Sequence, residues 1–271
     1  MSKYIHIFSD KDEYEQYIKS TGYTEPFLGH IGVESGTGMV FENLFFVDPG
    51  VEEICVNTWG NGSSVLSFSN LAKVTDIGGV FYDRTDIYNL DDFQYFEGVT
   101  GLTYASTKGC FGGCSNLLSI KFPKSLKSVN SYAFNGCNKL TELIFPEGFT
   151  TVNGYSLGGY SGLRYLEFPS TLTTIGRNNL CPAGINLSYN IVIRATTPPS
   201  LDETGCFQYY SGAFRKNTAA KIYVPYSSDH SVLQAYQNDT HWATIIGWGI
   251  NIYELNSDGT IPFSTHQGGT N

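Results

Sequence analysis

The sequence predicts a mainly β solenoid with few short helices, in which coils of 23 residues stack along one axis. Three observations predict this fold: a gapless internal repeat, an alternating segment that ends at a proline in each copy, and apolar positions that every copy shares. A single coil of this length cannot bury its own apolar side chains, so several coils must stack to form a core. We therefore expect an array of coils with a capping region at each end.

The repeat emerges when residues 111–133, 134–156 and 157–179 are laid over one another without gaps. Each copy contains a short segment of alternating apolar and polar residues, which indicates a strand, and the proline that follows indicates where the strand ends. Small thiols recur within the copies, which favours a shared buried position over metal binding. The matching columns include Phe111, Phe134 and Leu157; Cys114 and Cys137; Leu117, Leu140 and Leu163; Phe122, Phe145 and Phe168; and Pro123, Pro146 and Pro169.

Weaker copies and changes in composition divide the chain into five expected segments. Strand-like runs at 191–193 and 221–224 extend the array beyond the full repeats, and a short helix is expected at 231–237. Ser9 precedes four acidic residues and is expected to cap a helix at 10–19. The segments are an N-terminal capping or mounting region at 1–50, a lead-in at 51–87, the solenoid at 88–226, a C-terminal cap at 227–255, and a flexible polar tail at 256–271.

The pattern F-x-G-C-x-x-L-x-x-I-x-F-P at Phe111–Pro123, followed by Leu126 and Val129, resembles the BspA-type leucine-rich repeats. Lys221–Pro225, the expected helix and Trp242 are similar to the closing element of that family. These repeats are common in gut-associated anaerobic bacteria and their phages, and the resemblance covers roughly residues 51–255. It implies a leucine-rich-repeat solenoid used in surface attachment and host interaction rather than in catalysis.

The lead-in resembles a segment of some of these proteins in which an EF-hand-like loop precedes the repeats. Trp59, Leu66–Ser67, Val74–Asp76 and Phe93–Phe96 match that segment, and the last of these is expected to be a strand. Calcium requires several anionic oxygen ligands, but no carboxylate occurs between Trp59 and Leu66. We therefore expect a degenerate loop that has become a plain turn, and a chain without a metal or a cofactor.

A catalytic alternative rests on Gly154–Gly158, which reads GYSLG and fits the nucleophile elbow of a serine hydrolase. Ser156, Asp202 and His230 would preserve the chain order of such a triad. However, the elbow needs a strand, a sharp turn and a helix, and the 23-residue period leaves no room for the helix. Ser156 also falls in the column of Ala133, which predicts a small residue beside the core. The sequence thus favours a protein that is not an enzyme.

Composition narrows the classes of partner. The formal net charge is −9 with only 16 Lys and Arg residues, which disfavours nucleic-acid binding. No run approaches the ~20 apolar residues of a membrane span, so membrane insertion is not expected. No apolar signal-peptide core follows the first residues, so we expect synthesis in the cytoplasm without export by the usual signal route.

Outward positions of the expected strands differ between copies, whereas inward positions stay apolar. Variation of this kind is what a ligand-reading face would show, although a face without a ligand would show it too. One outward column contains Ser119, Glu142 and Tyr165, and the next contains Lys121, Ile144 and Glu167. The candidate ligand-binding residues are Lys121, Glu142, Ile144, Tyr165 and Glu167.

These observations favour a non-catalytic binding or adhesion module that is associated with a phage virion or displayed on a surface. Its expected partners are a host surface protein or glycan, and virion or surface scaffold proteins through the N-terminal region. The alternatives are a BspA-like adhesin of a bacterial cell surface, a virion decoration protein without a ligand, and the serine hydrolase. The sequence leaves homo-oligomerisation open.

Overall fold

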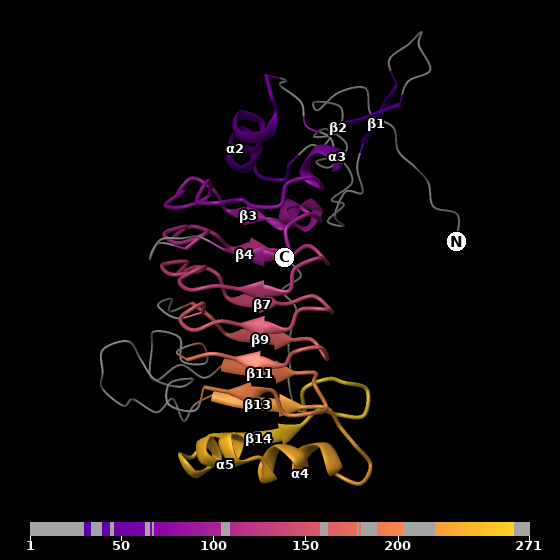
Figure 1. Ribbon diagram of the computed structural model, residues 1–271, viewed down its shortest axis with the longest axis vertical. Helices are drawn as coiled ribbons and strands as arrows, with labels where there is room; N and C mark the ends of the chain where they lie inside the picture. Colours follow the sequence, from indigo (N-terminus) through magenta and orange to yellow (C-terminus); the bar gives the residue numbers. More distant parts are fainter. Residues whose placement is uncertain are drawn as a thin grey trace.

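The computed structural model describes residues 30–33, 40–43, 46–62, 66, 68–103, 109–157, 162–177, 179, 189–202 and 220–262. The helix expected at 10–19 lies outside these residues. Strands and a few helices make up the described part, as the sequence predicts. Figure 1 shows them stacked along the long axis, with α2 and α3 at one end and α4 and α5 at the other.

Two parallel five-stranded sheets run along the stack. The short-strand sheet contains β4 (Gly101–Leu102), β6 (Ser128–Val129), β8 (Thr151–Val152), β10 (Thr174–Ile175) and β12 (Ser200–Leu201). The long-strand sheet contains β7 (Glu142–Ile144), β9 (Tyr165–Phe168), β11 (Tyr189–Ile193), β13 (Ala220–Val224) and β14 (Asn251–Glu254). A further parallel pair is formed by β3 (Asn89–Leu90) and β5 (Ser119–Ile120).

The chain alternates between the two sheets, and each return places a strand beside the strand before it. Thr151 pairs with Thr174 in one sheet and Glu142 pairs with Tyr165 in the other, in each case 23 residues further on. Side-chain bonds at the same interval cross between successive turns of the chain, as from Ser131 to the Gly154 carbonyl. Later strands pair over longer intervals, because longer connections precede β13 and β14.

Stacked aromatic rings fill the interior. Phe122, Phe145 and Phe168 form one continuous stack, with ring centroids 4.9 and 5.4 Å apart and planes within 7° of parallel. Phe111 and Phe134 stack beside them at 5.5 Å. Burying a phenylalanine side chain contributes about 1.5–3 kcal/mol, and ring pairs in good geometry add about 0.5–1.5 kcal/mol. Each repeat is therefore stabilised mainly by contact with the equivalent residues of its neighbours.

The recurring thiols are buried, unpaired cysteines that bond to the backbone of the preceding turn. The Cys114 thiol donates to the Phe81 carbonyl over 2.9 Å, and the Cys137 thiol donates to the Phe111 carbonyl over 3.1 Å. The contact with Cys114 and burial together raise the pKa of Cys137. These thiols are thus polar atoms satisfied within the core, as expected from the repeat.

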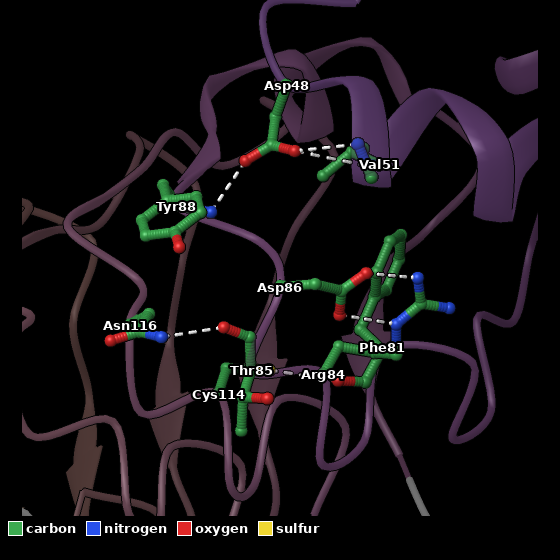
Figure 2. A network of polar contacts seen from close by, with 10 residues as sticks. Asp48, Val51, Phe81, Arg84, Thr85, Asp86, Tyr88, Cys114 and Asn116 are labelled. Carbon is green, nitrogen blue, oxygen red and sulfur yellow. Dashed lines mark hydrogen bonds and ion pairs between the residues drawn. The ribbon is translucent and has the colours of Figure 1, made fainter.

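At the N-terminal end, β1 (His30–Val33) pairs antiparallel with β2 (Val40–Asn43), and helices α2 (Pro49–Trp59) and α3 (Phe68–Leu71) follow. The buried carboxylate of Asp48 joins α2 to the start of β3 (Figure 2). One oxygen caps the helix by accepting from Gly50 N at 2.9 Å, and the other accepts from Tyr88 N at 2.5 Å and Asn89 N at 2.9 Å. A single side chain therefore satisfies open backbone donors of both elements.

The strand expected at Phe93–Phe96 is wrong. The structure has a 3-10 helix, η1 (Asp91–Tyr95), at this place. The Asn89 side chain accepts from Asp91 N over 2.7 Å and so favours a turn rather than an extended backbone. A 3-10 helix repeats every three residues, which brings both Phe93 and Phe96 into the core.

At the C-terminal end, α4 (Ser231–Asn238) coincides closely with the helix predicted at 231–237, whereas α5 (Thr240–Gly247) was not predicted. Both helices are fixed to the array by buried ring donors. The Tyr236 hydroxyl donates to the Ala195 carbonyl and Trp242 Nε1 donates to the Pro199 carbonyl, each over 2.8 Å. After α5 the chain returns as β14, so the segment expected to be only a cap also supplies a strand of the long-strand sheet.

Replacing Gly176 with alanine should destabilise the stack. A Cβ at Gly176 would lie 2.6 Å from Gly154 N, against the backbone of the preceding turn. We expect a loss of about 1–3 kcal/mol in the free energy of unfolding, measured by chemical denaturation. Gly247→Ala is the matched control, because a Cβ there meets no atom within 4 Å and alanine favours a helix. Equal stability of the two variants would contradict the close approach of the turns.

Asp92 should make the stability depend on pH. Burial raises the pKa of Asp92 to about 6, although its carboxylate accepts from Val47 N over 2.6 Å. Because the pKa is raised in the folded state, the stabilisation is complete below the unfolded pKa of ~3.9 and is lost as the pH rises through about 6. The unfolding free energy of the wild type relative to Asp92→Asn should therefore fall by about 3 kcal/mol between pH 3 and pH 8. Chemical denaturation of both proteins at several pH values would measure this. A difference in unfolding free energy that stayed constant or rose with pH would contradict the prediction.

Candidate functional site

Four of the five candidate residues lie on adjacent strands of the long-strand sheet. Glu142 on β7 is the register partner of Tyr165 on β9, and Ile144 is the partner of Glu167. The residues between them, Leu143 and Leu166, are buried in the core. We call the outward side of this sheet the candidate face.

Lys121 lies apart from that group in the hydrogen-bonded topology. It follows β5, which pairs with β3 rather than with β7. Its ammonium group forms an ion pair with Asp91 over 3.1 Å, and both partners are at least partly accessible to solvent. Accessible pairs of this kind contribute little to stability, about 0–1 kcal/mol. The lysine therefore supplies a positive charge near one end of the array.

Register places five outward residues in one row across the candidate face, which we call the central row. It consists of Ile144, Glu167, Val192, Tyr223 and Tyr253. Ile144 at one end is 47% exposed and Tyr253 at the other end is 41% exposed. In the middle of the row, however, Val192 is 0% exposed and Tyr223 is 6% exposed. Val192 and Tyr223 in the centre of the row are thus covered, whereas the side chains at its two ends are open to solvent.

The cover is the chain segment that follows β14. Leu255, Val192 and Tyr223 form a second apolar cluster, separate from the core, and Tyr165 and Ile261 pack against it. We call residues 256–262 the strap. A turn reverses the chain at its start, where Asn256 N donates to the Thr260 carbonyl over 2.8 Å and Gly259 has a φ of +81°. These residues begin the segment expected to be a flexible tail, and two of them, Gly259 and Ile261, contact residues of the long-strand sheet or its end.

A polar network links the strap to the predicted residues. Arg194 Nε donates to Glu167 Oε1 over 2.7 Å, and Arg194 Nη1 donates to the Gly259 carbonyl over 3.0 Å. The Tyr165 hydroxyl donates to the other oxygen of Glu167. Burial and this hydrogen bond raise the pKa of Tyr165, and the bond to Glu167 raises the pKa of Arg194. Glu167 is thus held within the protein rather than directed freely to solvent.

Sequence reasoning missed Arg194 and the strap. Arg194 follows the end of a strand outside the regular copies, and Gly259 lies 65 residues further along the chain. Neither position carries a repeat signal, so their meeting depends on how the chain returns after α5. The sequence also did not predict that Val192 is buried, because the alternation of side chains indicates only that it points away from the core.

The structure rules out Ser156 as an accessible nucleophile. Its side chain is 0% exposed, and Oγ lies within donating distance of two backbone carbonyls, 2.8 Å from Val129 O and 2.6 Å from Asn153 O. The other two members of the imagined triad bind elsewhere: Asp202 accepts from Arg177, and His230 contacts Glu254. The burial of Ser156 and the separate partners of Asp202 and His230 therefore argue against a triad of these three residues.

The lead-in has no acidic ligand cluster among its described residues. Across the described part of the chain, no group of three or more His, Cys, Asp or Glu side chains is placed to hold a metal ion. A shallow hollow of about 500 Å³ opens at this end of the molecule, lined by Trp59, Asn61, Asn70, Lys73, Val74, Thr75 and Asp76. The described helices are all too short or too polar to cross a membrane.

A fluorophosphonate probe should leave Ser156 unlabelled, because no reagent reaches a hydroxyl enclosed by the stack. Ser156→Ala should lower the free energy of unfolding by about 1 kcal/mol through the lost hydrogen bond. Mass spectrometry of the probe-treated protein and a denaturation curve of the variant would check both outcomes. Labelling of the folded protein at Ser156 would contradict the structural role.

Comparison with known proteins identifies the repeats. A family model described as the BspA type leucine-rich repeat region matches residues 106–197 in six copies. No curated protein sequence matches the chain. The matched residues include β5 to β11 and the stacked phenylalanines, and repeats of this kind generally mediate protein–protein interaction in surface proteins. Residues 106–197 therefore match the BspA-type leucine-rich repeat family, as the sequence resemblance predicts.

Proposed function

We propose that the protein is a capped leucine-rich-repeat solenoid that acts as a non-catalytic binding or adhesion module. The observation that carries this proposal is the contrast between the two sides of β7 and β9. Inward residues such as Leu143 and Leu166 are repeated and buried, whereas their outward neighbours differ in size and charge. A row of varied side chains on a rigid sheet is suited to recognition, because the scaffold fixes each position before a partner arrives.

The chemistry of the exposed end of the candidate face supports a macromolecular partner. Ile144 offers an apolar contact that solvent reaches, and Glu142 beside it offers a charge. Interfaces commonly combine an apolar centre with polar groups at the edge. The proposed contact residues are Lys121, Glu142, Ile144, Tyr165 and Glu167, with the last two acting through the network around Arg194.

In this proposal the protein is carried on a phage virion or displayed on a surface, and recognises a host surface protein or glycan. The N-terminal region attaches it to virion or scaffold proteins. Support comes from the family match, because proteins with these repeats are generally surface proteins. A bacterial adhesin is the second candidate, favoured by the same family match.

Ile144→Ala should weaken binding without changing stability, because its side chain is 47% exposed. Loss of an apolar contact at an interface centre costs about 1–2 kcal/mol, or roughly tenfold in affinity. An array of purified cell-surface proteins and glycans from gut bacteria and mucosal epithelium would provide the partners. Val47→Ala is the matched control, since Val47 is 57% exposed but lies before α2 at the N-terminal end. Equal affinity of both variants would exclude the candidate face.

Location can be tested separately from binding. Mass spectrometry of purified phage particles and of peptides shaved from intact cells by protease should find the protein in the particles. Its absence from particles, together with its presence among shaved peptides, would contradict the virion proposal and support the adhesin.

A further inference from the structure

We propose that the strap, residues 256–262, is a displaceable cover of the candidate face, and that the uncovered face takes an extended polypeptide of the partner in its place. The inference rests on the proposed binding function and deepens it, because it selects a polypeptide over a glycan. Four observations carry it: the buried middle of the central row, the position of the strap outside the strand pairing, the polypeptide nature of the cover, and the exposed ends of the row.

The strap covers apolar side chains that the sheet alone would expose. Val192 and Tyr223 are outward residues of β11 and β13, and both are buried in a cluster with Leu255, which directly precedes the strap. Ile261 of the strap packs against this cluster. Covering exposed apolar side chains of this kind is favourable by a free energy of about 25 cal/mol for each Å² of apolar surface removed from water. The gain is available to any segment that lies across the two strands, whether it belongs to this chain or to a partner.

The anchors of the strap are weak compared with those of β14. Leu255 N donates to the Val224 carbonyl and continues the strand pairing. Beyond it, residues 256–262 leave the strand pairing, Arg194 donates to the Gly259 carbonyl, and the partly buried side chain of Ile261 packs against the apolar cluster. The remaining bonds of the strap close its own turn, such as those from Thr260 to Asp258. A segment held in this way opens locally at much lower free energy than the core.

The contacts that hold the strap describe the ligand that would replace it. The aliphatic side chain of Ile261 packs against the cluster that contains Val192 and Tyr223, and the main-chain carbonyl of Gly259 accepts from Arg194. A polypeptide offers both groups at a fixed spacing, whereas a glycan has no aliphatic side chain to fill the apolar surface. Arg194 stays oriented by Glu167 when the strap leaves, so its second nitrogen remains directed toward an incoming carbonyl.

The row continues beyond the strap on both sides. On one side, Ile144 on β7 is exposed and is the register partner of Glu167. On the other side, Tyr253 on β14 is exposed and is the register partner of the covered Tyr223. A partner segment that displaces the strap therefore meets a longer row than the strap covers, with exposed apolar side chains at both ends and Glu167 between Ile144 and Val192. Displacement would add the contact with Val192 and Tyr223 to the contact with Ile144, and this would lower the dissociation rate of the complex.

Opening of the strap can be measured by thiol labelling of two full-length variants. Val192→Cys places a thiol beneath the strap, and Ile191→Cys places one on the core side of the same strand. With iodoacetamide and mass spectrometric mapping, Cys at position 192 should react at least about a hundredfold faster than Cys at position 191, because only the strap must open. Adding Ile261→Ser should increase the alkylation rate at position 192 further and leave the alkylation rate at position 191 unchanged. Equally slow reaction at both positions would overturn the proposal.

The nature of the partner can be tested with a labelled peptide that has the sequence of residues 255–262. It should bind the full-length Ile261→Ser protein at least about tenfold more tightly than the wild type, whose own strap competes for the face. A matched peptide with serine in place of the isoleucine should bind neither protein. Equal binding to both proteins, or binding to neither, would overturn the polypeptide assignment. The peptide experiment also tests whether the strap is displaceable if a cysteine variant fails to fold.

These outcomes are separable from those of the proposed function, because neither arm uses an external partner. Loss of array binding in Ile144→Ala with no opening of the strap would retain the binding face and reject the cover. Opening of the strap and peptide exchange with no effect of Ile144→Ala would retain the exchangeable strap and reject the β7 end of the face.

Discussion

The structure depends on one constraint: no single turn of the chain can bury its own inward side chains. Phe122, Phe145 and Phe168 are shielded from water because each lies against the ring above or below it. Stability is therefore shared between neighbouring turns, as in other repeat proteins. The same constraint requires covers at both ends, and α2 at one end and α4 with α5 at the other supply apolar side chains to the core. Where the chain leaves the repeat pattern, side-chain hydrogen bonds such as those of Asp48, Tyr236 and Trp242 replace regular pairing.

Stacking constrains only the inward half of each strand, which leaves the outward half available for function. On β7 and β9 this freedom produces a mixed face of charged, aromatic and aliphatic residues. On β11 and β13 the outward residues are apolar, and the chain itself covers them. The face is therefore not uniform: its middle is a contact already made within the molecule, and its ends are open. A repeat protein of this design can present recognition groups without altering its core, which is the physical basis for proposing a binding role.

The segment GYSLG illustrates how a repeat can imitate a catalytic motif. Ser156 follows Ala133 by one repeat interval, and Asn179 follows Ser156 by the same interval. All three positions are buried, and the polar ones bond to backbone groups of adjacent turns. Serine fits this position because its side chain is small and its hydroxyl can donate to the backbone carbonyls nearby. An elbow motif has catalytic meaning only where its hydroxyl reaches solvent and a base, and neither condition is met.

The repeat in the sequence was sufficient to predict the stacking of successive copies, the inward columns and the shared columns of Glu142 with Tyr165 and of Ile144 with Glu167. Each follows from a fixed interval and from side-chain alternation. It also indicated the family that the comparison identifies. The η1 helix was missed because a hydrogen bond from Asn89 outweighed the apolar pattern. The covering of Val192 and Tyr223, and the meeting of Arg194 with Gly259, were decided only by the tertiary structure. These contacts join segments that share no periodicity, so only the path of the chain after α5 brings them together.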